Sequence, residues 1–192
     1  MNMNKSLLGI IDATQNFESV GILTTHRNVA ALPIAGRFRL IDFILSSMVN
    51  SGISNVAVYP QHHFRSLMDH LGTGKNWDLN RKRDGLFFLP VPHTAETNGE
   101  ITSLEHFSYH MTYLERSEQE YVVVANSYTV CNIDFNAVLK EHLKLGGDIT
   151  EIKKGKVSLN MYVLKKELLV KLIEERKETG YTSVSEAVHD HY

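Results

Sequence analysis

The chain has 192 residues, 43% of them hydrophobic and 22% charged, and a formal net charge of −2. This composition indicates a globular protein with one sizeable core, and the single cysteine, Cys131, excludes a disulfide within the chain. The slight negative charge argues against nucleic acid or an anionic membrane as a partner. Since every apolar run is too short for a signal peptide or a membrane span, we expect a cytoplasmic protein.

Short apolar runs alternate with helix-like stretches along the first half of the chain. We expect strands at 6–11, 55–59 and 86–92, and helices at 40–50 and 63–71. The helix at 40–50 is the clearest, because its apolar residues recur at i, i+3 and i+4 and form one face. A polar loop should precede the third strand; its cations Lys75, Arg81, Lys82 and Arg83 are either solvated or able to touch an anion.

The same alternation continues in the second half. We expect helices at 103–116, 135–146 and 165–178 and a strand at 121–125, which is apolar at successive positions and therefore covered on both faces. Between 148 and 164, two strand-like pieces flank the charged hexamer EIKKGK. The β-α-β order predicts an α/β fold, a three-layer sandwich whose mostly parallel sheet carries helices on both faces.

One long stretch, LTTHRNVAALPIAGRFRLIDFILSSMVNSGISNVAVYPQ at 23–61, carries a specific pattern. An unbroken match from Gly36 to Phe43, and a second from Asn50 to Ile53, follow the order G-G-K/R-Y/F-R-L/I-I-D-F and N-S-G-I. In this pattern the chain resembles bacterial glucose-1-phosphate adenylyltransferase (ADP-glucose pyrophosphorylase). Weaker similarity covers most of the chain, so the resemblance implies that 1–192 is a nucleotidyltransferase (Rossmann-like) domain.

The chain departs from this family where the family handles phosphate. The family places G-G-x-G-T-R-L after its first strand, whereas residues 12–21 here hold one glycine, two acidic residues and no lysine or arginine. The lysine of R-A-K-P becomes Val29. In the later motif G-D-H-I-Y-x-M-D, whose first Asp holds the metal, only the final Asp134 survives. The phosphate cradle, the cationic clamp and the metal carboxylate are therefore all missing from the sequence.

These departures resemble the GlgD-type branch of the family, whose members are non-catalytic, regulatory subunits. The resemblance implies a role in glycogen biosynthesis beside a catalytic GlgC-type subunit, in a heterotetramer that joins ATP and glucose 1-phosphate into ADP-glucose and pyrophosphate with Mg²⁺. We then expect no catalytic residue, bound metal or cofactor in this chain. Two alternatives stay open: an active nucleotidyltransferase, and a stand-alone sensor of sugar phosphate or nucleotide.

Candidate binding residues lie near the best-matched stretch. In the resembling family, sugar-phosphate activators or inhibitory nucleotides bind near these positions at a subunit interface. Arg27 and Arg39, with His26 and Gln61 as weaker members, are therefore candidates for an anion-binding effector site, because the arginine fork suits phosphate. The alternative is that these arginines are solvated surface charges.

Other polar residues have simpler explanations. Asp42 is expected as a first-turn carboxylate favoured by the helix dipole. Asp134 is either a remnant of the metal region or, as we favour, the N-cap of a helix. His106 and His110 share a helix face, but the Glu of an H-E-x-x-H motif is missing, so no metal site is expected.

The length also differs from that of the family, whose members are about twice as long and end in a left-handed β-helix. No hexapeptide periodicity of that kind occurs here. The family also has additional residues, including an E-K-P sugar-binding segment, where this chain has EIKKGK. We therefore expect an internal segment to be missing near 150–157, either by deletion or by omission of residues from this sequence.

Overall fold

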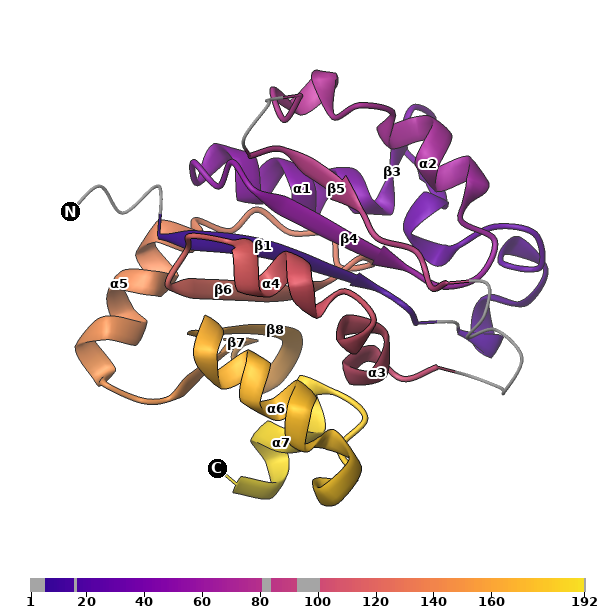
Figure 1. Ribbon diagram of the computed structural model, residues 1–192. Helices are drawn as coiled ribbons and strands as arrows, with labels where there is room; N and C mark the ends of the chain where they lie inside the picture. The colour runs from indigo at the N-terminus through magenta and orange to yellow at the C-terminus, as the bar shows by residue number, and fades with distance from the viewer. Residues whose placement is uncertain (1–5, 16, 81–83, 93–100, 192) are drawn as a thin grey trace.

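The computed structural model describes residues 6–15, 17–80, 84–92 and 101–191 (Figure 1). In this part of the chain, six strands form one sheet in the order β5-β4-β1-β6-β8-β7. β5, β4, β1 and β6 run parallel, while β8 is antiparallel to β6 and to β7. The strands are β1 Leu7–Ala13, β4 Val56–Pro60, β5 Leu86–Phe88, β6 Tyr121–Asn126, β7 Ile149–Lys154 and β8 Val157–Lys165.

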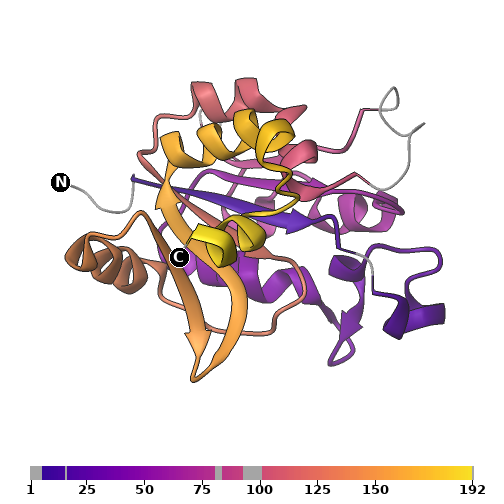
Figure 2. The same ribbon diagram turned by 90° about the horizontal axis from the view of Figure 1, so that it is seen from below.

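Helices cover both faces of this sheet, which confirms the predicted three-layer α/β sandwich (Figure 1, Figure 2). One face packs against α1 Leu40–Asn50, α2 Arg65–Leu71 and α5 Phe135–Leu145. The other packs against α3 Ser103–Ser108, α4 Met111–Arg116, α6 Lys166–Thr179 and α7 Val184–His191. Among the described residues, no helix is long and apolar enough to cross a membrane.

The two cores follow from the alternation of side chains along β1. Leu7 and Ile11 point to the α1 side, and Leu8 and Ile10 point to the α3 side. All four side chains are buried, as expected for a central strand of a parallel sheet. Asp12 lies two residues after Ile10 and points to the same side of the sheet. Its carboxylate therefore lies on the α3 side, at the end of the strand.

The predicted helix at 40–50 coincides with α1, but the helix expected at 103–116 is divided into α3 and α4. The division falls at His110, whose φ of −122° and ψ of 27° are not helical. Nε2 of His106 and Nε2 of His110 donate to the carbonyls of Leu89 and Pro90 at 2.8 and 2.9 Å. These contacts anchor both halves to the segment after β5, at the point where the helix breaks.

Short irregular elements complete the frame. Between β1 and α1 lie the 3-10 turns η2 Glu18–Leu23 and η3 Val29–Ala31, and a two-stranded ribbon of β2 Pro33–Ile34 and β3 Phe38–Arg39. A further turn, η4, spans Lys75–Trp77. The basic residues Arg81, Lys82 and Arg83 of the same predicted loop lie outside the described residues.

The hexamer EIKKGK lies within the β7–β8 hairpin, at the junction where the sequence predicts a missing segment. β7 ends at Lys154 and β8 begins at Val157, so the turn consists of Gly155 and Lys156, with Gly155 at a φ of +63°. β8 pairs with β6 only from Met161 to Lys165. The tip of the hairpin therefore extends beyond the sheet.

Candidate functional site

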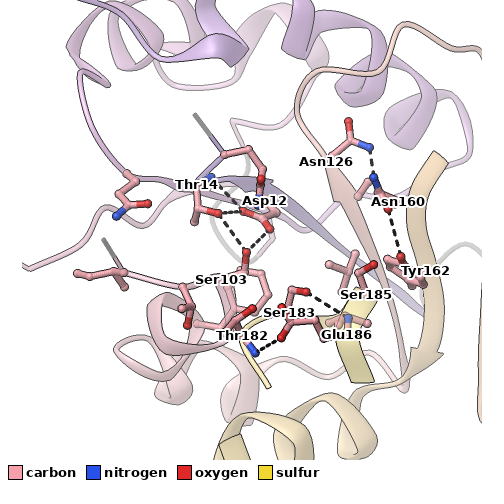
Figure 3. Close-up of a pocket in the computed structure, with 18 of the residues that line it drawn as sticks. Asp12, Thr14, Ser103, Asn126, Asn160, Tyr162, Thr182, Ser183, Ser185 and Glu186 are labelled. Carbon is pink, nitrogen blue, oxygen red and sulfur yellow. Dashed lines mark hydrogen bonds between the residues drawn. The ribbon is translucent and has the colours of Figure 1, made fainter. Parts of the chain in front are cut away.

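A cavity of about 460 Å³ opens at the carboxyl ends of β1 and β6 (Figure 3). These strands are neighbours, but β1 leads on to β4 and β5 on one side, whereas β6 leads on to β8 and β7 on the other. Open α/β sheets bind ligands at such a switch point, in the crevice outside the carboxyl ends of the strands. The cavity is therefore the candidate functional site.

The floor of the cavity is built around Asp12, at the end of β1. Oδ1 of Asp12 accepts from the backbone N–H of Thr14 at 3.0 Å and from its hydroxyl at 2.6 Å. Oδ2 accepts from Oγ of Ser103 at 2.5 Å, and the two hydroxyls lie 3.0 Å apart. Oδ2 thus fastens the end of β1 to the first turn of α3, while Oδ1 closes the turn directly after the strand.

The β6 side is shaped by Asn126, the last residue of that strand. Its Oδ1 accepts from the backbone N–H groups of Tyr128 and Thr129 at 3.1 and 2.9 Å, which closes a turn directly after the strand. Its Nδ2 donates to the carbonyl of Leu159 at 2.6 Å. Asn126 is buried, and its amide joins the turn after β6 to the β8 strand.

Asn160 lies where β8 leaves its pairing with β6, and it has a φ of +49°. Asparagine adopts this left-handed conformation more readily than most residues other than glycine, but still at a cost. Nδ2 donates to the hydroxyl of Tyr128 at 3.4 Å, and Oδ1 accepts from the hydroxyl of Tyr162 at 3.4 Å. The two tyrosines and the amide all line the cavity, and Figure 3 shows Asn160 beside Tyr162.

The start of α7 forms the opposite wall. Glu186 accepts from the backbone N–H of Thr182 at 2.7 Å, while its own N–H donates to Oγ of Ser183 at 3.3 Å. Ser183 is thus the N-cap of α7, and the side chain of Glu186 also holds the backbone of the residue before this cap. The carbonyl of Thr182 also accepts from the N–H of Leu104 at 3.0 Å, which ties α7 to α3 beside the cavity.

The described lining residues of the cavity include one imidazole, that of His62, but no lysine or arginine. Its carboxylates are Asp12 and Glu186, and the remaining polar groups are hydroxyls and amides. Burial raises the pKa of Tyr128, whose ring packs edge-on against Phe17 with the centroids 4.7 Å apart. Its hydroxyl therefore remains protonated at neutral pH. The full lining is Asp12, Thr14, Gln15, Gln61, His62, Ile101, Thr102, Ser103, Phe107, Val124, Ala125, Asn126, Tyr128, Asn160, Tyr162, Thr182, Ser183, Val184, Ser185 and Glu186.

The four predicted effector residues occupy different environments. His26 and Arg27 are exposed between η2 and η3, with the ring of His26 lying 6.5 Å from that of His63. Nη1 of Arg39 donates to Oγ of Ser66 at 2.9 Å and to the carbonyl of the same residue, so this arginine is joined to α2.

Gln61, the fourth of these residues, is buried in the wall of the cavity. In the amide orientation that satisfies both of its ends, Gln61 donates to the carbonyls of Thr14 and Ile101 and accepts from the N–H of Ile101. Within the described residues, no hydrogen bond or ring contact joins Gln61 to Arg27 or Arg39.

Two aspartates take the structural roles expected for them. Asp134 accepts from the N–H groups of Asn136 and Ala137 at 2.9 and 3.4 Å, which confirms it as the N-cap of α5. Asp42, in the first turn of α1, accepts from the N–H of Arg39 at 2.9 Å and also contacts Nε2 of His70 at 2.6 Å.

Sequence reasoning missed most of the cavity. Ser103, Asn160 and the pair of Ser183 and Glu186 come from segments far apart in the chain, and none lies in a motif that indicates a binding site. One signal was present for α7: the spacing of Ser183 and Glu186 is that of a capping box, S-x-x-E. It marks the start of a helix, but it does not show that the helix begins at a cavity.

The cavity residues do not fit the Mg²⁺ ion of the resembling family. Counting back from Asp134, the metal-holding Asp of the family motif falls on Tyr128, whose neutral hydroxyl is a poor ligand for a hard cation. Both oxygens of Asp12 already accept hydrogen bonds from the chain. In the described part of the chain, no group of three or more His, Cys, Asp and Glu residues is arranged to hold a metal.

Comparison with known proteins identifies the family. The family model described as nucleotidyl transferase matches residues 22–161. The chain belongs to the nucleotidyl transferase family. This confirms the predicted fold, since the mostly parallel sheet with helices on both faces is consistent with a nucleotidyltransferase domain.

The most informative relatives carry the name predicted from the motifs. The chain is 54% identical over 192 residues to the glycogen biosynthesis protein GlgD of Geobacillus stearothermophilus, covering 99% of this chain and 56% of that protein. It is 50% identical over 185 residues to GlgD of Bacillus subtilis (strain 168), covering 96% and 54%. The nucleotidyl transferase chain thus spans about half the length of these relatives.

A third relative is named as an enzyme. The glucose-1-phosphate adenylyltransferase of Clostridium novyi (strain NT) is 31% identical over 150 residues, covering 77% of this chain and 39% of that protein. The resemblance carried by residues 23–61 is therefore confirmed, and the similarity to the proteins named GlgD is the stronger of the two.

Proposed function

We propose that this chain is the nucleotidyltransferase-like part of a regulatory, catalytically inactive subunit of glucose-1-phosphate adenylyltransferase in glycogen biosynthesis. Its partner is a catalytic GlgC-type subunit, with which it forms a cytoplasmic hetero-oligomer, a heterotetramer. That partner joins ATP and glucose 1-phosphate into ADP-glucose and pyrophosphate with Mg²⁺. The proposal is supported by the similarity to proteins named GlgD and to glucose-1-phosphate adenylyltransferase.

The observation that carries the proposal is the chemistry of the cavity at the switch point. Phosphoryl transfer depends on positioning and on stabilising the charge of the phosphates, which requires cationic side chains, free N–H groups or a metal. The described lining has no lysine or arginine, and the carboxylate of Asp12 is committed to Thr14 and Ser103. A triphosphate would therefore find neither a positive field nor a metal anchor.

The segment after β1 argues in the same direction. Family enzymes have a glycine-rich loop there, whereas this chain has the turn η2, with Ile22 89% exposed to solvent. From Asp12 to Gly21 the segment contains no cationic residue. Under this proposal, the chain keeps the scaffold and the surfaces that bind its partner, and the partner subunit carries out catalysis.

The test uses the full-length protein, purified with and without the GlgC-type subunit of the same organism. We expect the two to co-purify, the mixture to synthesise ADP-glucose faster than the catalytic subunit alone, and the full-length protein alone to give no turnover above background. An equal mass of an unrelated protein serves as the control. Turnover without the partner would support the enzyme alternative, and absence of both co-purification and rate change would refute the regulatory role.

A further inference from the structure

The cavity combines a negative charge with many neutral polar groups. Asp12 and Glu186 supply carboxylates, and the described lining contains no lysine or arginine to offset them. A ligand carrying phosphate would be placed beside like charges, which lowers its affinity. The lining therefore disfavours phosphorylated ligands, although the cavity occupies the ligand-binding position of an α/β sheet.

Two helices begin at this cavity, and helix N-termini attract anions only when their N–H groups are free to bind them. The N–H groups of Leu104, Glu105, Thr182 and Glu186 all donate hydrogen bonds within the chain. The start of α3 is thus largely satisfied by the protein itself, while at α7 this holds for Glu186 and for Thr182, which precedes the helix. These helix starts do not replace the missing cations.

Hydrogen-bonding capacity for an uncharged ligand is nevertheless present. Thr102 and Ser183 each accept a backbone N–H as the N-cap of their helix, and a hydroxyl that accepts still has its own O–H to donate. The side-chain amide of Asn160 makes only long contacts, 3.4 Å each, with the hydroxyls of Tyr128, Ser158 and Tyr162. A bound hydroxyl group can replace these long contacts with shorter ones.

The backbone at Asn160 supports a binding role for its side chain. A φ of +49° is costly for a residue with a side chain, and such strain is concentrated at functional sites. Glycine would relieve the strain, yet the chain has an asparagine whose amide lines the cavity. Figure 3 shows this amide between Asn126 and Tyr162.

From this chemistry we propose that the cavity binds an uncharged, hydroxyl-rich ligand of the sugar class that carries no phosphate. Its hydroxyls exchange hydrogen bonds with Asn160, Tyr162 and Ser183, and the carboxylate of Glu186 acts as an acceptor. The inference rests on the proposed function, because a subunit that does not turn over sugar phosphate can use this cavity to sense a different molecule. The bound sugar is then the signal that the regulatory subunit transmits.

Isothermal titration of the 192-residue chain with glucose, maltose, glucose 1-phosphate, ATP and adenosine tests the ligand class. We expect saturable binding of glucose or maltose, at least tenfold tighter than that of glucose 1-phosphate. Equal or tighter binding of glucose 1-phosphate or ATP would overturn the inference. Binding of adenosine without either sugar, or no saturable binding at all, would also overturn it.

Two variants test the location. Asn160→Gly removes the amide but tolerates the positive φ, and Tyr162→Phe removes only a hydroxyl, so both should fold. We expect each to weaken sugar binding at least fivefold, while Tyr109→Phe, an exposed tyrosine outside the lining, leaves it unchanged. Unchanged affinity in both cavity variants would refute this site. Co-purification with the catalytic subunit is measured separately, so failure here leaves the proposed function standing.

Discussion

Ser103 donates a hydrogen bond to Oδ2 of Asp12 at 2.5 Å, although the two residues are 91 positions apart in the sequence. The bond joins the end of β1 to the first turn of α3 along the floor of the cavity. Asp12 begins the segment where family enzymes have their phosphate loop. In this chain the carboxylate of Asp12 instead joins the end of β1 to α3.

Replacing Ser103 with alanine tests this role. The change leaves Oδ2 of Asp12 without its hydroxyl donor, and hydrogen bonds to charged groups contribute about 1.5–3 kcal/mol. We expect the free energy of unfolding to fall by about 1–2 kcal/mol in urea titration. The control is Ser108→Ala on the same helix, where the hydroxyl donates only to the nearby carbonyl of Glu105. An equal or larger loss in the control would contradict the assignment.

Close packing between β1 and α1 gives a second prediction. A Cβ added at Gly9 would lie 2.8 Å from Sδ of Met48 and 3.1 Å from Cγ2 of Val56, and both side chains are fully buried. We expect Gly9→Ala to lower the free energy of unfolding by about 1–3 kcal/mol, the usual cost of overpacking. Gly147→Ala is the matched control, because its nearest neighbour would be a carbonyl oxygen at 3.9 Å. A neutral Gly9→Ala would show that Met48 repacks freely.

The motifs and the periodicity predicted most of this frame. The helix at 40–50 was placed correctly because its apolar spacing is decided by local geometry alone. The single helix at 103–116 was wrong because His106 and His110 bond to carbonyls of a segment that precedes them by 17 and 20 residues, contacts that no local pattern reveals.

The cavity was less predictable than the frame. Motif comparison predicts the loss of phosphate-binding residues after β1. However, several groups that line the cavity come from the β8 strand and from α7, in the part of the chain where motifs are weakest. Asn160 has no sequence signal for its positive φ, since that conformation is imposed where β8 separates from β6.

Burial makes His106 a determinant of stability at low pH. Burial lowers the pKa of His106 to about 4, and the nearby His110 adds to the effect, while the bond to the carbonyl of Leu89 opposes it. An unfolded histidine titrates near 6.5, so between about pH 6.5 and 4 the unfolded state binds more protons. Stability should therefore be fully present above about pH 6.5 and fall as the pH approaches 4, by about 3 kcal/mol in total from this residue.

The variant His106→Gln keeps a donor for the carbonyl of Leu89 but removes the titrating ring. We expect its free energy of unfolding, measured in urea at intervals from pH 7 to 4, to change less steeply than that of the unmodified chain. Some slope should remain, because burial also lowers the pKa of His142. His26→Gln, an exposed histidine, is the control and should retain the full slope. Identical slopes in all three proteins would refute the role of His106.

The two candidate effector arginines differ in their contacts within the chain. This difference allows a structural role to be distinguished from a binding role by mutation. Arg39 donates to the hydroxyl and the carbonyl of Ser66, whereas the exposed side chain of Arg27 makes no hydrogen bond or ion pair within the described residues. We expect Arg39→Ala to lower the free energy of unfolding by about 1–2 kcal/mol and Arg27→Ala to change it by less than about 0.5 kcal/mol.

Titration with a sugar phosphate or nucleotide, followed by the rate of the partnered enzyme, gives the second measurement. If Arg27 binds an anionic effector, Arg27→Ala raises the effector concentration needed for half the response without altering stability, and Arg27→Lys restores part of it because one charge remains. A half-response concentration that is unchanged in Arg27→Ala would identify this arginine as a solvated surface charge. Ser66→Gly is the control for Arg39→Ala, because it removes the hydroxyl contact of Arg39 and leaves the charge of that arginine in place. An increase in the half-response concentration in Arg39→Ala indicates effector binding only if it exceeds the increase in Ser66→Gly.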